Sequence, residues 1–375
     1  MKTNKEKQID QTQQLNNHLY NGYLNLSLLK LDSISITKEY CIQNEITHIN
    51  LASNNLHKLS DIFEFTTLKE LNLSFNKLKQ LPKLSESLTK LSLSHNEFVQ
   101  LNQTNRSNTN SQLFDSLIEL NISHNKITEF PPMKQLQKID CSFNCFNSSQ
   151  LFQTLSSLTS LNITGNQFTE FIIEDNSHLI ELKCSMNSIK TIKLNISALT
   201  FLDISFNPIE SIDIHQCISL HSLYLNNTSP IKYFSSIETS FPIQIKELSL
   251  SSCELMQFPK QLTYFTDLTS LNLSSNGLLI LSPQYTQLQQ LKKLDVSLNL
   301  LQSFPVIHSN LEELNIGGNF YLQKSNKTVP FQLKTFSLLS PIEIDKNVHI
   351  SSFVNAYNCE YIDEKNITAI VYCGK

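Results

Sequence analysis

One eleven-residue phrase recurs thirteen times between Ile46 and Tyr321, in the pattern apolar-x-x-apolar-x-apolar-x-x-Asn-x-apolar. Clear copies are LKELNLSFNKL at 68–78 and LTSLNLSSNGL at 268–278. The first apolar position moves from Ile46 to Leu311 in twelve steps, which gives a mean period of about 22 residues. A fixed period of this length predicts a chain built by stacking similar coils rather than one folded around a central core.

The middle of each phrase predicts a short β-strand with one buried face. Leu71, Asn72 and Leu73 alternate apolar and polar side chains, and the other copies follow them. A single strand of this kind cannot bury its apolar side, so we expect neighbouring copies to pair into a parallel sheet. The inner ridge of that sheet would comprise Leu71, Leu91, Leu120, Ile139, Leu161, Leu182 and Leu202.

The asparagine position predicts a hydrogen-bonded turn after each strand. A turn inside the stack leaves backbone groups without partners, and a side-chain amide supplies both donors and an acceptor. Thr228 and Cys253 replace the amide in two copies, and both side chains can still donate. The predicted structural ladder is Asn54, Asn76, Asn96, Asn125, Asn144, Asn166, Asn187, Asn207, Asn276, Asn299 and Asn319.

The period also limits the rest of each coil. Strand and turn use about half of the 22 residues, so the return segment is too short for a long helix. We expect extended, 3₁₀ or single-turn helical segments there. Strands spaced by about 4.8 Å on one side and wider segments on the other would curve the stack into a horseshoe with a concave parallel sheet.

Three regions follow from this pattern. We expect a disordered tail and an N-terminal cap at 1–45, and the repeat array at 46–339 with a half repeat at its end. Residues 340–375 are interpreted as a C-terminal cap or as the start of a truncated domain. The polar stretch at 103–112 is predicted to be a mobile loop.

Composition and charge exclude several classes of partner. The formal net charge is −4, and Arg106 is the only arginine, so we expect no nucleic acid partner. No apolar run is long enough to span a membrane, and the polar start has no apolar core for a secretory signal. The eight cysteines are scattered and interpreted as structural thiols, and together these features predict a cytoplasmic protein.

Catalytic and metal-binding patterns are not found in the sequence. Six glycines form no phosphate-binding loop, and no cluster has metal-ligand spacing, so we expect no enzymatic activity and no cofactor. His95 and His124 both precede the repeat asparagine. Other copies carry Phe, Met or Leu in that position, so we interpret it as variable surface filling rather than as a metal or acid–base site.

The phrase resembles the leucine-rich repeat superfamily over about four-fifths of the chain. Copies in which proline follows the last strand residue, such as 268–305, resemble the intracellular class found in Ras-pathway scaffolds and in the regulatory subunit of protein phosphatase 1. The shorter copy at 81–98 is nearer the form of bacterial effector proteins. The resemblance implies a non-catalytic scaffold or adaptor that binds a protein on its concave face. The alternative is the recognition half of a larger leucine-rich repeat phosphatase, kinase or ubiquitin ligase.

A cluster of large side chains marks the predicted partner-binding site. They lie at outward or rim positions of three successive copies, where most other copies carry small or charged residues. Local filling over the asparagine turn is the other interpretation, which would leave only Phe201 and Tyr224 exposed. The predicted binding residues are Ile180, Met186, Phe201, Phe206 and Tyr224.

Overall fold

The fold was analysed in a computed structural model in which the chain forms two compact units. The first comprises Met1–Asp203 with Ile212–Ile218, and the second comprises Ile204–Ser211 with Ser219–Lys375. The described residues are 8–9, 15–59, 64–101, 114–174, 178–229, 240–242, 244–307, 309–319, 321–322, 335–337, 342–345 and 348–350, with side chains between 15 and 322. The polar stretch at 103–112, most of the predicted tail and most of 340–375 lie outside them.

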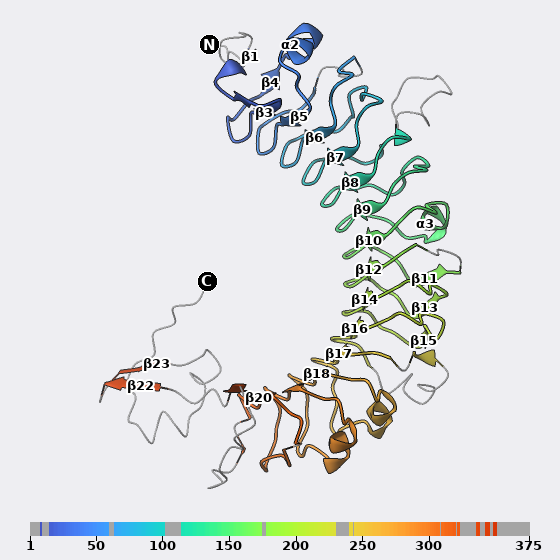
Figure 1. Cartoon of the computed structure of the whole chain (residues 1–375), viewed down its shortest axis with the longest axis vertical. Helices are drawn as coiled ribbons and strands as arrows, with labels where there is room; N and C mark the ends of the chain where they lie inside the picture. Colours follow the sequence, from blue (N-terminus) through green and yellow to red (C-terminus); the bar gives the residue numbers. More distant parts are fainter. Residues whose placement is uncertain are drawn as a thin grey trace, which may run out of the picture. The chain divides into compact units, whose positions relative to one another are not determined.

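The first unit is a stack of coils whose strands pair side by side (Figure 1). Strands β2 and β3 form an antiparallel hairpin, and from β3 to β14 every printed pairing is parallel and in register. The strands are β2 (Leu19–Tyr20), β3 (Tyr23–Asn25), β5 (His48–Asn50), β6 (Glu70–Asn72), β7 (Lys90–Ser92), β8 (Glu119–Asn121), β9 (Lys138–Asp140), β10 (Ser160–Asn162), β12 (Glu181–Lys183) and β14 (Phe201–Asp203).

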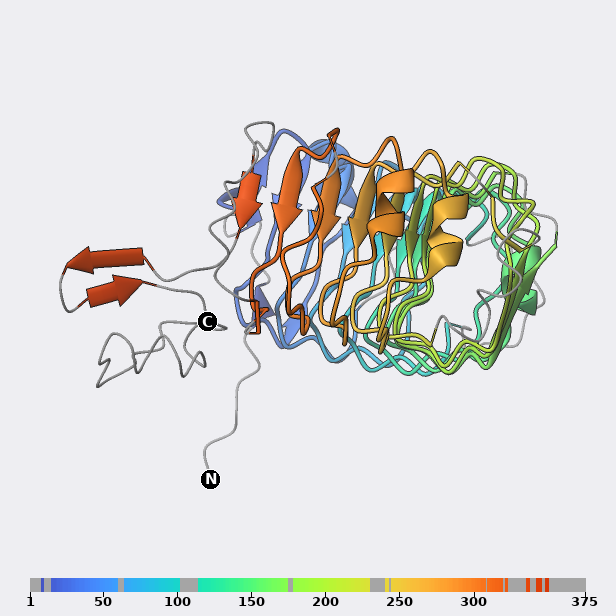
Figure 2. The ribbon, with the colours of Figure 1, turned by 90° about the horizontal axis from the view of Figure 1, so that it is seen from below.

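The second unit repeats this arrangement with β16 (Ser222–Tyr224), β17 (Glu247–Ser249), β18 (Ser270–Asn272), β19 (Lys293–Asp295), β20 (Glu313–Asn315) and β21 (Thr335–Ser337). The strands are parallel and in register. Figure 2 shows those coloured orange to red lying side by side and pointing the same way. The predicted parallel-sheet solenoid is therefore confirmed in each unit.

Each strand is short because only its middle residue and the apolar positions around it are buried. Leu71, Leu91 and Leu161 are at most 3% exposed, and the flanking polar residues of their strands face outward. Burying such a side chain stabilises the fold by roughly 1.5–3 kcal/mol. The inner ridge predicted from the alternation thus forms the core.

The return segments are short, as the period requires. Helices α2 (Lys38–Gln43) and α3 (Gln150–Gln153) and the 3₁₀ helices η4 (Lys260–Tyr264) and η5 (Pro283–Gln287) have six residues or fewer. A second parallel sheet, not predicted from the sequence, contains β11 (Glu170–Ile173), β13 (Thr191–Leu194) and β15 (Ser211–Asp213). Two small pairs complete the strands: β1 (Gln8–Ile9) with β4 (Ser33–Ile34), and β22 (Ile342–Asp345) with β23 (Val348–Ile350).

The repeat asparagines join neighbouring coils through hydrogen bonds. Nδ2 of Asn76 donates to the carbonyl of Leu73 in its own coil and to that of Leu51 in the preceding coil, at 3.1 and 2.9 Å. Its Oδ1 accepts the backbone N–H of Leu56, also from the preceding coil, at 3.0 Å. One amide therefore pairs backbone groups from two coils.

The two residues that replace the asparagine, Thr228 and Cys253, still form hydrogen bonds with backbone groups at this turn. Oγ1 of Thr228 donates to the carbonyl of Leu225 at 2.6 Å. Sγ of Cys253 donates to the same carbonyl at 3.1 Å, and the Cys253 backbone N–H donates to Oδ1 of Asn276 at 2.9 Å. A hydroxyl or a thiol supplies fewer donors than an amide.

Among the described residues, no helix combines the length and apolar character that crossing a membrane would need.

The ladder generates a first prediction. Nδ2 of Asn166 donates to the carbonyls of Cys141 and Ile163, both at 3.0 Å, whereas the outward Asn162 only accepts the N–H of Thr164 at 3.1 Å. Asn166→Ala should cost roughly 1–3 kcal/mol by leaving buried backbone groups unpaired. Asn162→Ala should stay within about 0.5 kcal/mol. Denaturant midpoints measure both, and equal losses would contradict the assigned roles.

Candidate protein-binding face

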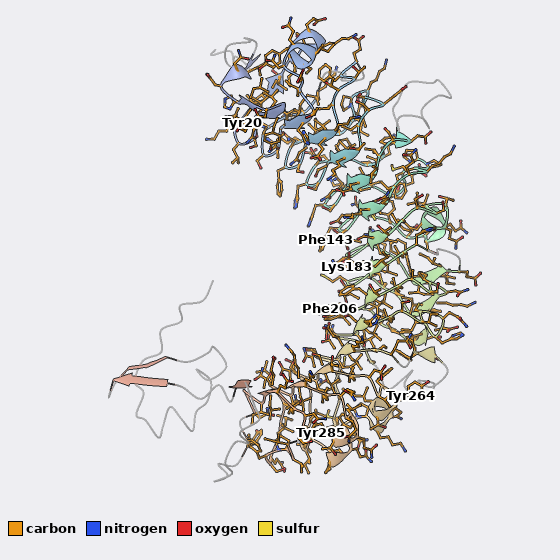
Figure 3. All side chains as sticks on the ribbon, in the orientation of Figure 1. Tyr20, Phe143, Lys183, Phe206, Tyr264 and Tyr285 are labelled. Carbon is orange, nitrogen blue, oxygen red and sulfur yellow. The ribbon has the colours of Figure 1, made fainter. Side chains whose placement is uncertain are left out.

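The outward face of the first unit's sheet is hollowed into a groove of about 510 Å³. Its lining comes from the strands β3, β5 to β10 and β12, so it runs across the strands rather than along them. Strand side chains project perpendicular to a sheet, which places the first and third residue of each strand in the groove. The side chains at those two positions determine the charge and the hydrogen-bonding groups of the groove. Figure 3 shows Lys183 on this side of the first unit.

The first positions form a charge ladder, here defined as His48, Glu70, Lys90, Glu119 and Lys138 on five successive strands. Nζ of Lys90 lies 3.5 Å from a carboxylate oxygen of Glu70 and 3.4 Å from one of Glu119. Lys138 and His48 extend the ladder at 3.7 Å from Glu119 and 3.5 Å from Glu70. Glu70, Lys90, Glu119 and Lys138 alternate in sign, so their charges largely neutralise one another within the face.

The ladder perturbs the pKa of its central lysine. The carboxylates of Glu119 and, secondly, Glu70 raise the pKa of Lys90. Further along, a hydrogen bond from Lys183 lowers the pKa of Glu181, whose carboxylate also accepts a bond from Ser160 at 3.0 Å. Both shifts favour the charged forms of Lys90 and Glu181, but exposed ion pairs add little to stability.

Three of the third positions, on β6, β8 and β10, carry amides whose hydrogen-bonding groups are only partly used. Oδ1 of Asn72 accepts the N–H and the hydroxyl of Ser74, at 3.0 and 2.6 Å. Oδ1 of Asn121 and that of Asn162 likewise accept N–H groups two residues ahead. The Nδ2 groups of these three asparagines have no hydrogen-bond partner among the described residues. The groove therefore offers three amide donors on alternate strands, suited to carbonyl or carboxylate oxygens, with Ser92 and Asp140 at the third positions between them.

Four stacked rings form a second feature of this unit, here called the ring column: Phe75, His95, His124 and Phe143. Successive ring centroids are 4.1, 3.9 and 4.5 Å apart, with interplanar angles of 11°, 13° and 15°. Each residue precedes a ladder asparagine in its coil. Phe75 and Phe143 are 52% and 39% exposed, so the column is a surface feature.

The ring column occupies backbone positions that disfavour side chains. All four residues have φ between 52° and 55°, in the left-handed region. That conformation costs a side-chain-bearing residue about 1–2 kcal/mol, which glycine avoids. Gly165 fills the same position in the next coil, with φ 67°. Stacking of about 0.5–1.5 kcal/mol per aromatic pair offsets part of this cost.

The interpretation of this position as variable filling missed the column. Its signal was present, since four successive copies carry a ring there. Stacking could not be read from the sequence because it depends on the rotamers and on the coil spacing. The near-parallel imidazoles do not converge on a common point. No group of three or more potential metal ligands occurs in the described part of the chain.

The five predicted binding residues are divided between the two units. In the first, Ile180 and Met186 are 46% and 51% exposed, while Phe201 is half-buried with Nζ of Lys183 5.6 Å from its ring centroid. In the second, Phe206 is 52% exposed and Tyr224 half-buried. Met186 and Phe206 are among the more exposed side chains of the described residues, and the assignment of all five residues to partner binding stays a prediction.

The cysteines within the described residues are free thiols, and all but Cys145 are buried. Burial raises the pKa of Cys41 to about 12 and that of Cys217 to about 11. Sγ of Cys141 and that of Cys184 donate to backbone carbonyls at 3.3 and 3.4 Å. Protonated thiols of this kind serve packing rather than chemistry.

Comparison with known proteins identifies the class of fold. Two families, both described as Leucine Rich Repeat, match the chain, one at residues 66–79 and the other at 116–133 and 157–179. Together with the parallel-sheet solenoid, these matches show that the chain is a leucine-rich repeat protein. A comparison with curated protein sequences gave no match.

Two solved structures show the same fold. The functional domain of InlJ from Listeria monocytogenes is 24% identical with a TM-score of 0.59, over 77% of this chain and 62% of that one. The chain thus spans less than two thirds of that domain. YopM, a leucine-rich effector protein from Yersinia pestis, is 20% identical with a TM-score of 0.59, over 84% of this chain and 88% of that one.

Gly165 provides a test of the ring column. A Cβ at Gly165 would lie 2.6 Å from Cδ1 of Phe143, and φ is positive there. Gly165→Ala should therefore cost about 1–2 kcal/mol and displace the Phe143 ring. At Gly277 a Cβ would lie 2.7 Å from Sδ of the flexible Met256 side chain and at an ordinary 3.5 Å from the Leu255 carbonyl oxygen. Gly277→Ala should cost less in denaturant unfolding, and the reverse order would contradict the assignment.

His95 predicts a pH dependence of stability. Burial and, secondly, the neighbouring His124 lower the pKa of His95. The unfolded chain regains the ordinary value, so it binds the proton more readily and the folded state loses stability as pH falls. Between about pH 7.5 and about pH 5, the wild type should lose more unfolding free energy than His95→Phe, which keeps a ring but cannot titrate. Equal losses in urea titrations would refute this.

Proposed function

We propose that this leucine-rich repeat protein is a non-catalytic scaffold that binds a protein partner on the groove face of its first unit. The observation that carries the proposal is the groove itself, lined by paired charges and by amide donors without partners. A surface of this kind presents many weak, directional contacts and little reactive chemistry. Such contacts, with a few large side chains at the centre, are typical of protein interfaces.

The charge ladder favours a protein over a nucleic acid. Glu70, Glu119 and Glu181 lie in or beside the groove and would repel phosphates, and each neighbouring lysine is already paired. Nucleic acid binding relies on a surplus of unpaired cations that release counterions. A protein segment with mixed charges and backbone carbonyls can bind this face without the repulsion that phosphates would meet at the glutamates.

The exposed apolar side chains supply the second part of the proposal. Ile180, Met186 and Phe201 lie on the coils of the first unit at the end of the groove, and Phe206 and Tyr224 belong to the second unit. We assign all five to partner contact, each within its own unit. Large apolar and aromatic residues are enriched among the residues that dominate binding energy.

Lys90 allows a sharp test of the groove. Lys90→Glu would place three acidic residues on the successive strands β6, β7 and β8. It would reverse the sign of the charge at the centre of the groove. Lys193→Glu is the matched control, because Lys193 also pairs with a glutamate, Glu174 at 2.9 Å, but lies on β13 of the second sheet.

The measurement is a calorimetric titration of the partner, which is first identified by affinity purification with mass spectrometry and then purified. We expect Lys90→Glu to weaken binding at least about tenfold and Lys193→Glu to leave it unchanged. Equal affinities for all three proteins would refute the proposal.

The apolar residues are tested in the same titration. Phe201→Ala and Tyr224→Ala should each weaken the partner by about 2 kcal/mol or more, with thermal stability nearly unchanged. Val99→Ala is a suitable control, because Val99 is 58% exposed but does not line the groove. Parallel loss of folding and binding would show instead that Phe201 and Tyr224 serve the core.

A further inference from the structure

The three amide donors of the groove recur at a fixed interval. Asn72, Asn121 and Asn162 are the third residues of β6, β8 and β10, and their Nδ2 groups have no partner in the described part of the chain. The sheet register places Ser92 between the first two and Asp140 between the last two. The donors are therefore two coils apart along one row, here called the amide row.

The three amides are held in the same way. Oδ1 of each accepts the backbone N–H two residues ahead, at 3.0 Å for Asn72 and Asn121 and at 3.1 Å for Asn162. That hydrogen bond fixes the plane of the amide, and the strand geometry places the three side chains on the same face of the sheet. Each Nδ2 group consequently lies at an equivalent place in its coil.

Hydrogen bonds between the coils set the length of the interval. The N–H that follows each third residue donates to the third residue of the next coil, from Leu73 to Ser92 at 2.8 Å and from Leu93 to Asn121 at 2.7 Å. These are the bonds of ordinary paired strands, which lie about 4.8 Å apart. Two coils therefore separate successive donors of the amide row by about 9.6 Å.

We infer that the partner presents a polyproline II segment to the amide row, in which one backbone carbonyl in every three accepts a hydrogen bond from Asn72, Asn121 or Asn162. This helix has three residues per turn and rises about 3.1 Å per residue, so equivalent carbonyls recur every 9.3 Å or so. Its backbone makes no internal hydrogen bonds, which leaves those carbonyls able to accept. The inference rests on the proposed function and names the segment that this partner contributes.

Other backbone conformations fit the amide row less well. An α-helix uses its carbonyls in internal hydrogen bonds, apart from those of its last turn. In a β-strand, carbonyls point alternately to the two sides, so residues three apart face opposite ways. A polyproline II helix returns the same side after three residues. Ser92 and Asp140 then lie opposite the two residues of each turn whose carbonyls point away.

Tyr23 adds an aromatic ring at one end of the groove. It is the first residue of β3, two coils before β6, and it is 40% exposed. Its hydroxyl accepts Nδ2 of Asn50 at 3.3 Å, and its ring lies edge-on to that of His48 with the centroids 6.2 Å apart. Grooves that recognise polyproline II segments are lined by aromatic side chains. A proline one turn before the contact with Asn72 would lie beside this ring.

The probe is a peptide of nine prolines with blocked termini, titrated into the full chain while NMR follows the side-chain amides. Nine residues form three turns of the helix, enough to reach all three donors. We expect saturable shifts at Asn72, Asn121 and Asn162, with a dissociation constant on the order of 1 mM. A nine-residue glycine–serine peptide has as many carbonyls but a flexible backbone, and should bind at least about fivefold more weakly.

Asn121→Asp removes one donor and keeps the turn. Asp140 shows that the fold accepts this side chain at a third position, because its Oδ1 accepts the N–H of Ser142 at 3.0 Å. We expect the variant to bind the nine-proline peptide at least about tenfold more weakly, since its carboxylate would face a carbonyl. Asn162→Ala, expected to keep nearly the stability of the wild type, removes a donor in another way. It should weaken the peptide at least about threefold, even if Asn121→Asp fails to fold.

Asn272→Asp is the matched control. Asn272 is the third residue of β18 in the second unit, and its Oδ1 accepts the N–H of Ser274 at 2.9 Å. It does not line the groove. This variant should bind the nine-proline peptide like the wild type.

Several outcomes would overturn the inference. They are an absence of saturable shifts at the three asparagines, undiminished binding by Asn121→Asp or Asn162→Ala, and an equal loss in Asn272→Asp. Equal or tighter binding of the glycine–serine peptide, or of an alanine-rich helical peptide, would also contradict it. The Lys90→Glu titration uses the whole partner instead of this probe. Failure of the proline peptide therefore leaves the groove proposal standing, and failure of the groove proposal is recognised separately.

Discussion

The side-chain amide at the end of each strand is the interaction on which the rest of this molecule depends. Without it, every coil would leave backbone carbonyls and N–H groups buried and unpaired at the turn, at a cost comparable to the stability of a whole domain when summed over the array. Asn76, by pairing with Leu51, Leu56 and Leu73, shows how one side chain satisfies groups from two coils. Because the turns are satisfied from within, the outward strand positions are free to vary.

That freedom explains the character of the groove. Core and turn positions fix the fold, so residues such as Lys90 and Glu119 are not required for stacking and can serve recognition. Their alternation keeps the face free of a strong field, and so favours selectivity by shape and hydrogen bonding over long-range attraction. The ring column, by contrast, occupies a strained backbone position. A ring at that position carries a conformational cost in free energy, whereas the charged residues of the groove lie on ordinary strand backbone.

Most of the fold could be predicted from the sequence, but less of the candidate site. The period-2 alternation around Leu71 predicted strand, face and register, because burial of one face leaves a single register open. The second sheet was not predicted, since EFII at 170–173 fits an extended return segment as well as a strand, and pairing depends on the neighbouring coil. The ring column was visible as residue types, yet its stacking depends on side-chain rotamers.

The second sheet has a consequence for the footprint that a partner can occupy. A coil stack curves only when its two sides differ in spacing, and β11 and β13 pair with the same strand spacing as β10 and β12 on the opposite side. These coils are therefore locally straight. The lining of the groove ends with Asn162 and Lys183, on the same coils that carry β11 and β13. The second sheet therefore limits the curved part of the groove. A convex partner would follow the surface only as far as the coils of β11 and β13, where the surface becomes flat.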